Sequence, residues 1–576
     1  MQTRITLIAA VFLFFFSILV VRLFFWQIIK GGELSSQARS QYEKGELVFA
    51  TRGNIFAKDG TWLAARGPAW LVFAELPKLE KKPSQVAELL APYFIKKEEG
   101  EEEKEFKIRL LDEIERIEEL LSRKDAFWVP IKHKITPDDK RSIEELDIAG
   151  LGMEPEETRV YPEASSAAHI LGFVGKNEEG EDIGYFGLEG YYDLSLSGKP
   201  GFLQRESDAK GVPILSADSL EIGAVGGVDL ITNIDKTVQL IIEKRLSEGI
   251  EKYGAQAGSV VVMNPESGAV YGMVSFPSYD PSEYFDFSDE LFKNPVVSSS
   301  FEPGSIFKVL VMSAALDAGV VKPDTVCEIC TGPLKVDKYY IRTWDDKYHP
   351  DSTMVDVIVN SDNVGMAYVG QKLGADELYD YLSAFGLGTL TGVDLQGEVS
   401  PQIRPKGTWN IVDLSTTSFG QGIAVTPIQM IRAVSAIANK GRLPTPHVVD
   451  RLRGEGWEEN ITPKDGPQVI SEDTAEKLTA MMVEAAKHGE AKWTYLRGFK
   501  VAGKTGTAQI PFAGHYDEEK TIASFVGFAP ANEPKFIMLV TLREPSSSPW
   551  SSETAAPLWY SIAKDLFLHF GIQPEN

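Results

Sequence analysis

Cysteine and histidine are scarce in this chain. Its 576 residues include two cysteines, Cys327 and Cys330, and seven histidines. A structural zinc site needs about four ligands, and neither a second cysteine pair nor a nearby histidine supplies them. The sequence therefore predicts no metal and no other cofactor. In an exported domain the two cysteines are expected either to form a small disulfide bond or to remain free thiols, and redox catalysis is a third alternative.

Basic residues are outnumbered, with 58 Lys and Arg against 83 Asp and Glu and a formal net charge of −25. A surface that binds a phosphate backbone should be basic, which excludes nucleic acid as a partner. The sequence also lacks internal repeats, and its densest acidic stretch is confined to residues 96–105. We expect this stretch to be a solvated loop followed by a surface helix, whose apolar stripe is Phe106, Leu110, Ile114, Ile117 and Leu121.

One long apolar run stands at the amino terminus. Residues 5–29 contain a single charged residue, Arg22, and about 20 apolar residues suffice to cross a bilayer. A cleaved signal peptide would end in small residues, whereas this run ends in bulky Phe24, Phe25 and Trp26. We expect an uncleaved membrane anchor, but its orientation is poorly encoded, since only the amino terminus and Arg4 precede the run while Arg22 and Lys30 lie at or beyond its end.

The pattern Ser-x-x-Lys occurs at Ser305, but also at Ser207 and Ser561, so alone it is weak evidence. Only around Ser305 do a Pro-Gly pair and a run of helix formers place the serine in the first turn of a helix, which Gly319 should end. The alternative for this serine is an ordinary helix cap beside a solvated lysine.

The spacing of Ser305 and Lys308 suits covalent catalysis. Residues three apart share a helix face, so the lysine amine can reach the serine hydroxyl. Apolar neighbours would lower the pKa of the amine, which could then take the serine proton as the hydroxyl attacks a carbonyl. Ser305 is therefore the candidate nucleophile and Lys308 its general base.

Ser-x-Asn follows at Ser361 and Asn363, in a segment that is irregular before Ser361 and helical after it. A loop there would project a hydroxyl able to relay a proton and an amide able to bind a peptide. The alternative is a local turn at a helix start, in which Asp362 and Asn363 bond to the backbone.

Lys-Thr-Gly occurs once, at Lys504–Gly506, and Thr507 follows it. The preceding residues, 498–502, are typical of a strand, and the glycines leave its edge open for an extended peptide. Lys504 is a candidate catalytic cation, and Thr505, Gly506 and Thr507 are candidate substrate-binding residues. The backbone N–H groups of Ser305 and Thr507 would form an oxyanion hole. The alternative is a basic turn.

These three motifs, in this order, make the sequence resemble the class B penicillin-binding proteins, which are monofunctional peptidoglycan D,D-transpeptidases. Lys58 and Asp59 stand where the family usually has aspartate and arginine. Other segments that resemble the family are residues 51–64 (TRGNIFAKDGTWLA), 159–175 (RVYPEASSAAHILGFVG), 187–201 (GLEGYYDLSLSGKPG), 263–281 (MNPESGAVYGMVSFPSYDP) and 418–430 (SFGQGIAVTPIQM).

The expected fold is α+β, with an antiparallel sheet flanked by helices, a β-rich N-terminal pedestal and one transmembrane helix. Residues 258–276 and 522–542 each favour two strands around a turn, and residues 231–253 favour a joining helix. The expected divisions are an anchor (5–29), a pedestal of the penicillin-binding protein dimerisation type (45–225), a joining segment (226–256) and a penicillin-binding transpeptidase domain (257–576).

The resemblance implies a serine enzyme that cross-links peptidoglycan stem peptides during elongation or division and is inhibited by β-lactams. It also implies an inner-membrane protein with residues 1–4 as a short cytoplasmic tail, an extracytoplasmic catalytic domain and a polytopic membrane glycan polymerase as partner. Two other classes remain open: a β-lactam-binding receptor, and a catalytically weak scaffold that activates a polymerase.

Overall fold

The computed structural model describes the chain except residues 1, 35–42, 98–100, 163–165, 179, 207–219, 462, 464–465, 513–514 and 576. The chain divides into two compact units. The first comprises residues 1–53 and 197–228, and the second comprises residues 54–196 and 229–576. Each unit is described by itself.

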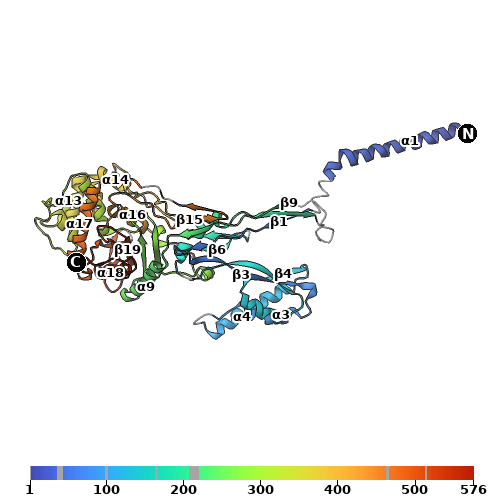
Figure 1. Ribbon diagram of the computed structural model, residues 1–576, viewed down its shortest axis with the longest axis horizontal. Coiled ribbons are helices and arrows are strands. Elements are labelled where there is room, and N and C mark those ends of the chain that lie inside the picture. Colours follow the sequence, from blue (N-terminus) through green and yellow to red (C-terminus); the bar gives the residue numbers. More distant parts are fainter. Residues whose placement is uncertain are drawn as a thin grey trace. The chain divides into compact units, whose positions relative to one another are not determined.

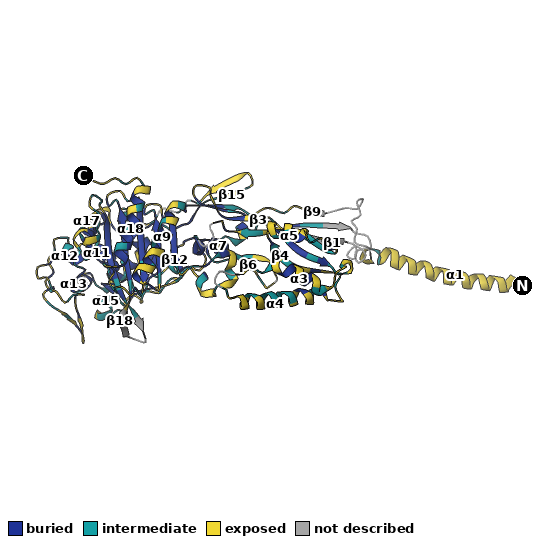
Figure 2. Cartoon of the chain, turned by 90° about the horizontal axis from the view of Figure 1, so that it is seen from below, coloured by how far each residue is buried: buried dark blue, intermediate teal, exposed yellow. Residues whose placement is uncertain are grey.

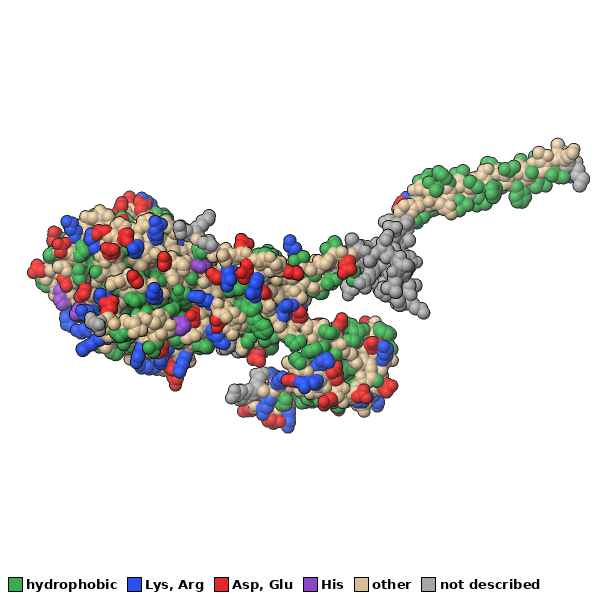
Figure 3. Space-filling model, in the orientation of Figure 1, with side chains coloured by type: hydrophobic (Ala, Val, Ile, Leu, Met, Phe, Trp, Pro, Cys, Tyr) green, Lys and Arg blue, Asp and Glu red, His purple; other side chains and the backbone are tan. Residues whose placement is uncertain are grey.

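The first unit contains the apolar run as helix α1 (Gln2–Phe24), continued by a π-helical segment to Ile29. Residues Gln2–Ile29 are long and apolar enough to cross a membrane, and none of the window that meets this test is buried. Figure 3 shows the apolar side chains along this helix. The unit also holds a three-stranded antiparallel sheet of β1 (Glu43–Val48), β8 (Gly201–Glu206) and β9 (Leu220–Ile222).

The amino-terminal part of the second unit is built on a seven-stranded sheet with the path β16-β15-β10-β2-β3-β4, and β5 pairs with β3. Helices α3 (Pro83–Phe94), α4 (Glu103–Leu121) and α5 (Pro137–Glu144) pack on it around a buried cluster that includes Val72, Leu90 and Ile117. The expected surface helix is thus confirmed as α4. The strands are β2 (Ile55–Phe56), β3 (Trp62–Glu75), β4 (Trp128–Ile135), β5 (Leu151–Val160), β10 (Asp229–Thr232), β15 (Val449–Gly454) and β16 (Trp457–Asn460).

A smaller hairpin follows this sheet along the chain. It consists of β6 (Phe173–Lys176) and β7 (Asp182–Tyr185), with the short helices α6 (Ala168–Leu171), α7 (Gly187–Tyr191) and α8 (Asp193–Leu196) beside it in sequence. Arg159 donates to the carboxylate of Glu189 at 2.6 Å, and both side chains are buried. A buried arginine must be paired, which fixes α7 against the end of β5.

The rest of the second unit is a five-stranded antiparallel sheet in the order β12-β11-β19-β18-β17. Helices α9 (Lys236–Tyr253) and α18 (Ala555–His569) cover one face of this sheet (Figure 1). Helices α11 (Lys308–Asp317) and α16 (Pro427–Ala438) belong to the hydrophobic core on the other face of the sheet. Figure 2 shows this core as the most buried part of the chain. The strands are β11 (Ala257–Met263), β12 (Val270–Phe276), β17 (Ala502–Phe512), β18 (His515–Ala529) and β19 (Phe536–Arg543).

The flanked antiparallel sheet, both predicted hairpins and the joining helix α9 are therefore confirmed. One boundary was wrong: the strand begins at Ala502, so Lys-Thr-Gly lies within β17 and not after it. The remaining elements are the 3₁₀ segments Leu76–Lys78, Pro281–Asp286, Asp289–Phe292, Gly304–Phe307 and Lys492–Thr494, the strands β13 (Leu334–Val336) and β14 (Tyr339–Ile341), and the helices α10 (Pro295–Ser298), α12 (Met354–Val359), α13 (Asn363–Leu373), α14 (Ala375–Ala384), α15 (Ile411–Thr417) and α17 (Glu472–His488).

Candidate active site

Ser305 lies in a 3₁₀ turn, Gly304–Phe307, that leads directly into α11. This confirms its expected place in the first turn of a helix. Gly304 has φ +55°, and a Cβ there would come within 2.9 Å of the carbonyl oxygen of Thr507. Glycine at 304 thus allows the turn that carries the serine to lie directly against strand β17.

Lys308, one helical turn further on, is fully buried. Its amine donates to the carbonyl oxygen of Ser361 (2.5 Å), to the Ser361 hydroxyl (3.3 Å) and to Oδ1 of Asn363 (2.7 Å). Burial, followed by the nearby Lys504 cation, lowers the pKa of Lys308 to about 7, against the opposing effects of Glu490 and Asp362. Near neutral pH this amine can therefore both accept and return a proton.

Ser361 occupies the turn between α12 and α13 with φ +56°. The segment before it was expected to be irregular, but it is the short helix α12, which begins with a reciprocal cap between Thr353 and Asp356. Asp362 makes the local turn that was the alternative for this motif, since its Oδ1 accepts from two N–H groups at the start of α13. Asn363 does not take part in that turn and instead binds Lys308.

Lys504 extends from β17, the edge strand of the sheet, toward Ser361. Its buried amine donates to the Ser361 hydroxyl at 2.9 Å and to Thr505 Oγ1 at 3.2 Å. Burial lowers the pKa of Lys504, and Glu490 opposes this effect. Two lysine amines thus contact one serine hydroxyl, which makes Ser361 the link between the three motifs.

The two hydroxyls beyond Lys504 have different partners. Thr505 Oγ1 donates to Glu490 at 3.0 Å, whereas Thr507 Oγ1 lies 3.0 Å from Ser551 Oγ and accepts from the Ser551 N–H at 3.1 Å. Sequence reasoning missed Glu490 and Ser551, because no motif contains them. Gly506 has no room for a side chain, since a Cβ would lie 2.7 Å from Ser524 Oγ.

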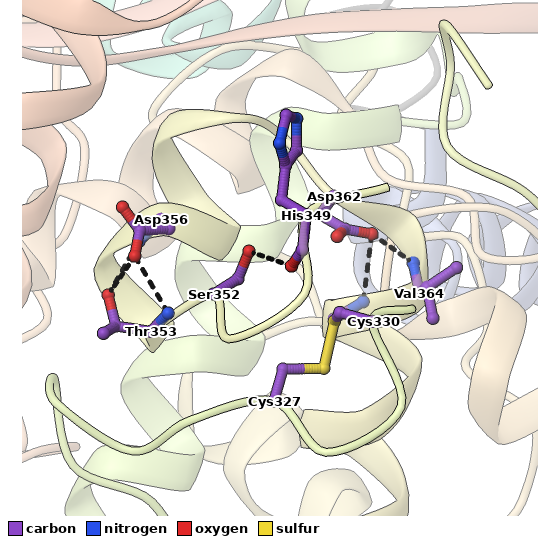
Figure 4. The surroundings of a disulfide bond; sticks show 9 residues. Cys327, Cys330, His349, Ser352, Thr353, Asp356, Asp362 and Val364 are labelled. Carbon is purple, nitrogen blue, oxygen red and sulfur yellow. Dashed lines mark hydrogen bonds between the residues drawn. A yellow bond between two sulfur atoms is a disulfide. The ribbon is translucent and has the colours of Figure 1, made fainter. Parts of the chain in front are cut away.

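Cys327 and Cys330 form a disulfide bond, so the alternative of two free thiols was wrong. Both residues are buried, and the Cys327 N–H donates to the Ser352 carbonyl at 2.8 Å. Figure 4 shows the disulfide near the start of α12 and the Asp362 turn. The disulfide therefore constrains residues 327–330, and Cys327 contacts Ser352, the residue before the cap of α12.

Comparison with known families identifies the fold. Residues 258–567 match the penicillin binding protein transpeptidase domain, and residues 47–231 match the penicillin-binding protein dimerisation domain. The chain belongs to the penicillin-binding protein transpeptidase family. With both domains it is a class B member, as its motifs predicted.

Relatives match this class B protein over nearly its whole length. Stage V sporulation protein D of Bacillus subtilis is 32% identical, over 97% of this chain and 85% of its own. The peptidoglycan D,D-transpeptidase FtsI of Buchnera aphidicola is 29% identical, over 100% of this chain and 96% of its own. Among solved structures, a peptidoglycan synthetase from Bifidobacterium adolescentis has a TM-score of 0.72 at 26% identity and covers 93% of this chain and 98% of its own.

Proposed function

We propose that this protein cross-links peptidoglycan stem peptides through an acyl-enzyme on Ser305. The observation that carries the proposal is the Ser361 hydroxyl, which accepts hydrogen bonds from the amines of both Lys308 and Lys504. Relatives that span the whole chain and are named peptidoglycan D,D-transpeptidases support the substrate class. A buried network with every motif residue present argues against a vestigial site on a scaffold.

The proton balance follows from the network. Neutral Lys308 takes the hydroxyl proton of Ser305 as the serine oxygen attacks the carbonyl carbon of the penultimate D-Ala. The C–N bond to the terminal D-Ala then breaks, and the amine of the leaving D-Ala receives that proton from Lys308. An uncharged amine of a second stem peptide then attacks the ester carbon, and the bond between that carbon and the Ser305 oxygen breaks. One proton of the attacking amine passes through Lys308 to the Ser305 oxygen, and the new amide is the cross-link.

The substrate would lie along β17. An edge strand offers unpaired backbone groups that an extended peptide can join, and Thr505, Gly506 and Thr507 lie on this strand. The N–H groups of Ser305 and Thr507 would hold the oxyanion. The close approach of Gly304 to Thr507 supports this placement.

The cross-linking itself can be measured with two synthetic stem peptides, one ending in D-Ala-D-Ala and one carrying only a free side-chain amine. We expect mass spectrometry to find the joined dimer, with one D-Ala released for each bond. Release of D-Ala without dimer at high acceptor concentration would contradict the proposal, and Ser305→Ala protein is the control for spontaneous reaction.

The anchor orientation is part of the same proposal. We place residues 1–4 in the cytoplasm, α1 in the inner membrane and the catalytic part outside, where peptidoglycan is built, beside a polytopic glycan polymerase. Protease added to intact spheroplasts is expected to remove nearly everything after Lys30 and to leave a membrane stub. Protection of the Ser305 region would show that the orientation is reversed.

A further inference from the structure

A small cavity of about 210 Å³ adjoins the catalytic network. It lies between the end of α17, the turn before α13 and the loop of residues 343–349. Asp362, which follows Ser361 in the chain, lines the cavity. Glu490 lines it as well, and this carboxylate accepts a hydrogen bond from Thr505 at 3.0 Å. Pockets for drug-sized ligands measure about 300–1,000 Å³, so this cavity suits a ligand the size of a single amino acid.

The residues that line the cavity include polar atoms without partners. Asp362 and Thr343 are 2% and 8% exposed. Within the described part of the chain, Oδ2 of Asp362 and the Thr343 hydroxyl have no hydrogen-bond partner. The other oxygen of Asp362 caps α13, and Glu490 uses one oxygen, Oε2, for Thr505. A buried carboxylate oxygen without a donor is costly, and an ammonium group, with three N–H donors, would satisfy it.

A positive charge lines the same cavity. Lys492 lies just beyond the end of α17 and makes no ion pair with any residue that the structure describes. Lys347, by contrast, is paired with Asp345 at 3.2 Å. A simple cation in the cavity would be repelled by Lys492, and a simple anion by Asp362 and Glu490. A ligand that carries both an ammonium and a carboxylate matches both signs of charge.

We propose that this cavity binds the D-Ala that the reaction releases, as a zwitterion. Asp362, Glu490 and the Thr343 hydroxyl hold its ammonium, and Lys492 attracts its carboxylate. The reaction proposed above releases one D-Ala for each cross-link, so this amino acid is produced close to the cavity. The identity of the ligand rests on the proposed function, whereas its zwitterionic chemistry rests on the lining residues.

The first test is a calorimetric titration of the full-length protein in detergent with D-Ala. We expect a Kd on the order of 1 mM, an affinity that a ligand of this size can supply. D-Lactate, which has a hydroxyl in place of the ammonium, should bind about 10-fold or more weakly. D-Alaninamide, which lacks the carboxylate, should bind about 3-fold more weakly, because an exposed lysine contributes less. Absence of D-Ala binding, or equal binding of either analogue, would overturn the inference.

Substitutions locate the bound D-Ala. Asp362→Asn keeps the oxygen that caps α13 and replaces the unpartnered oxygen with an amide nitrogen, so D-Ala should bind about 10-fold or more weakly. Lys492→Met should weaken binding about 3-fold. Lys487→Met is the matched control, because Lys487 is exposed in the last turn of α17 and does not line the cavity. It should bind D-Ala like the parent. Parent affinity in either cavity variant would overturn the inference, and if Asp362→Asn protein does not fold, Lys492→Met and the two analogues still decide.

Protein that carries a penicillin adduct separates the cavity from the peptide groove along β17. The adduct on Ser305 fills the groove and leaves the residues that line the cavity unmodified. D-Ala should therefore bind the adduct with the Kd of the parent. Loss of binding on acylation would place D-Ala in the groove and would refute the cavity site.

The two proposals fail in different ways. If penicillin does not label Ser305 and stem peptides are not joined, the proposed function falls, and D-Ala binding is still measured on the unlabelled protein. If Ser305 is labelled and stem peptides are joined while D-Ala does not bind, only the cavity site falls.

Discussion

Lys308→Ala protein is expected to be acylated by penicillin about 100-fold or more slowly than the parent, the usual effect of losing a positioned base. The Lys308 amine is the basic group one helical turn from Ser305, and it is fully buried with hydrogen bonds to Ser361 and Asn363. Stopped-flow labelling measures the rate. Acylation of Lys308→Ala protein at the parent rate would remove this residue from the mechanism.

The same rate measured against pH gives a second readout. Only the uncharged amine can take the Ser305 proton, and the pKa of Lys308 is about 7. The rate of the parent should therefore rise through neutral pH and level off above it. The residual rate of Lys308→Ala protein should lack this rise. A fall in the parent rate as the pH rises through 7 would mean that the protonated amine is the active form.

Ser305→Ala is expected to abolish the covalent adduct altogether, because no other hydroxyl occupies the helix turn beside Lys308 and β17 within the described residues. Ser561 provides a matched control. It carries the same Ser-x-x-Lys spacing, but it lies within α18, on the helix that covers the opposite side of the sheet from α11. Ser561→Ala protein should label like the parent. Persistent labelling in Ser305→Ala protein would show that the nucleophile is elsewhere.

Much of the fold could be predicted because it depends on local sequence patterns, such as apolar periodicity and turn residues. The apolar stripe of α4, the two hairpins of the catalytic sheet and the apolar run of α1 follow from periodicity and turn residues. The pairing of β15 with β10 could not be predicted, since Asp229 and Arg453 meet across more than two hundred residues of chain. Helix α12 was missed because its six residues are too few for a helical period to show, and it depends on the cap at Thr353.

The candidate active site also contains residues that the sequence predicted and residues that it did not. The order of the motifs predicted one site that contains Ser305, Lys308, Ser361, Asn363 and Lys504. In the structure, direct hydrogen bonds join Lys308, Ser361, Asn363 and Lys504. Glu490 and Ser551 carry no sequence signal, because their roles arise only where the end of α17 and the loop before α18 meet β17. The redox state of Cys327 and Cys330 could not be predicted from the sequence, because their close spacing permits a disulfide bond without requiring one.

Intact-mass spectrometry of the penicillin adduct, followed over time after free drug is removed, tests the central claim most directly. Transpeptidases and β-lactamases share the three motifs. Fast hydrolysis of the acyl-enzyme, however, needs a base that activates a water molecule. In class A β-lactamases a Glu-x-x-Asn element supplies this base, and the element is absent from the sequence. We predict that the parent gains the mass of one drug molecule at Ser305 and keeps it far longer than a catalytic turnover, while Ser305→Ala protein gains none. Loss of the adduct within about a second, as at typical turnover rates, with hydrolysed drug accumulating, would contradict the account.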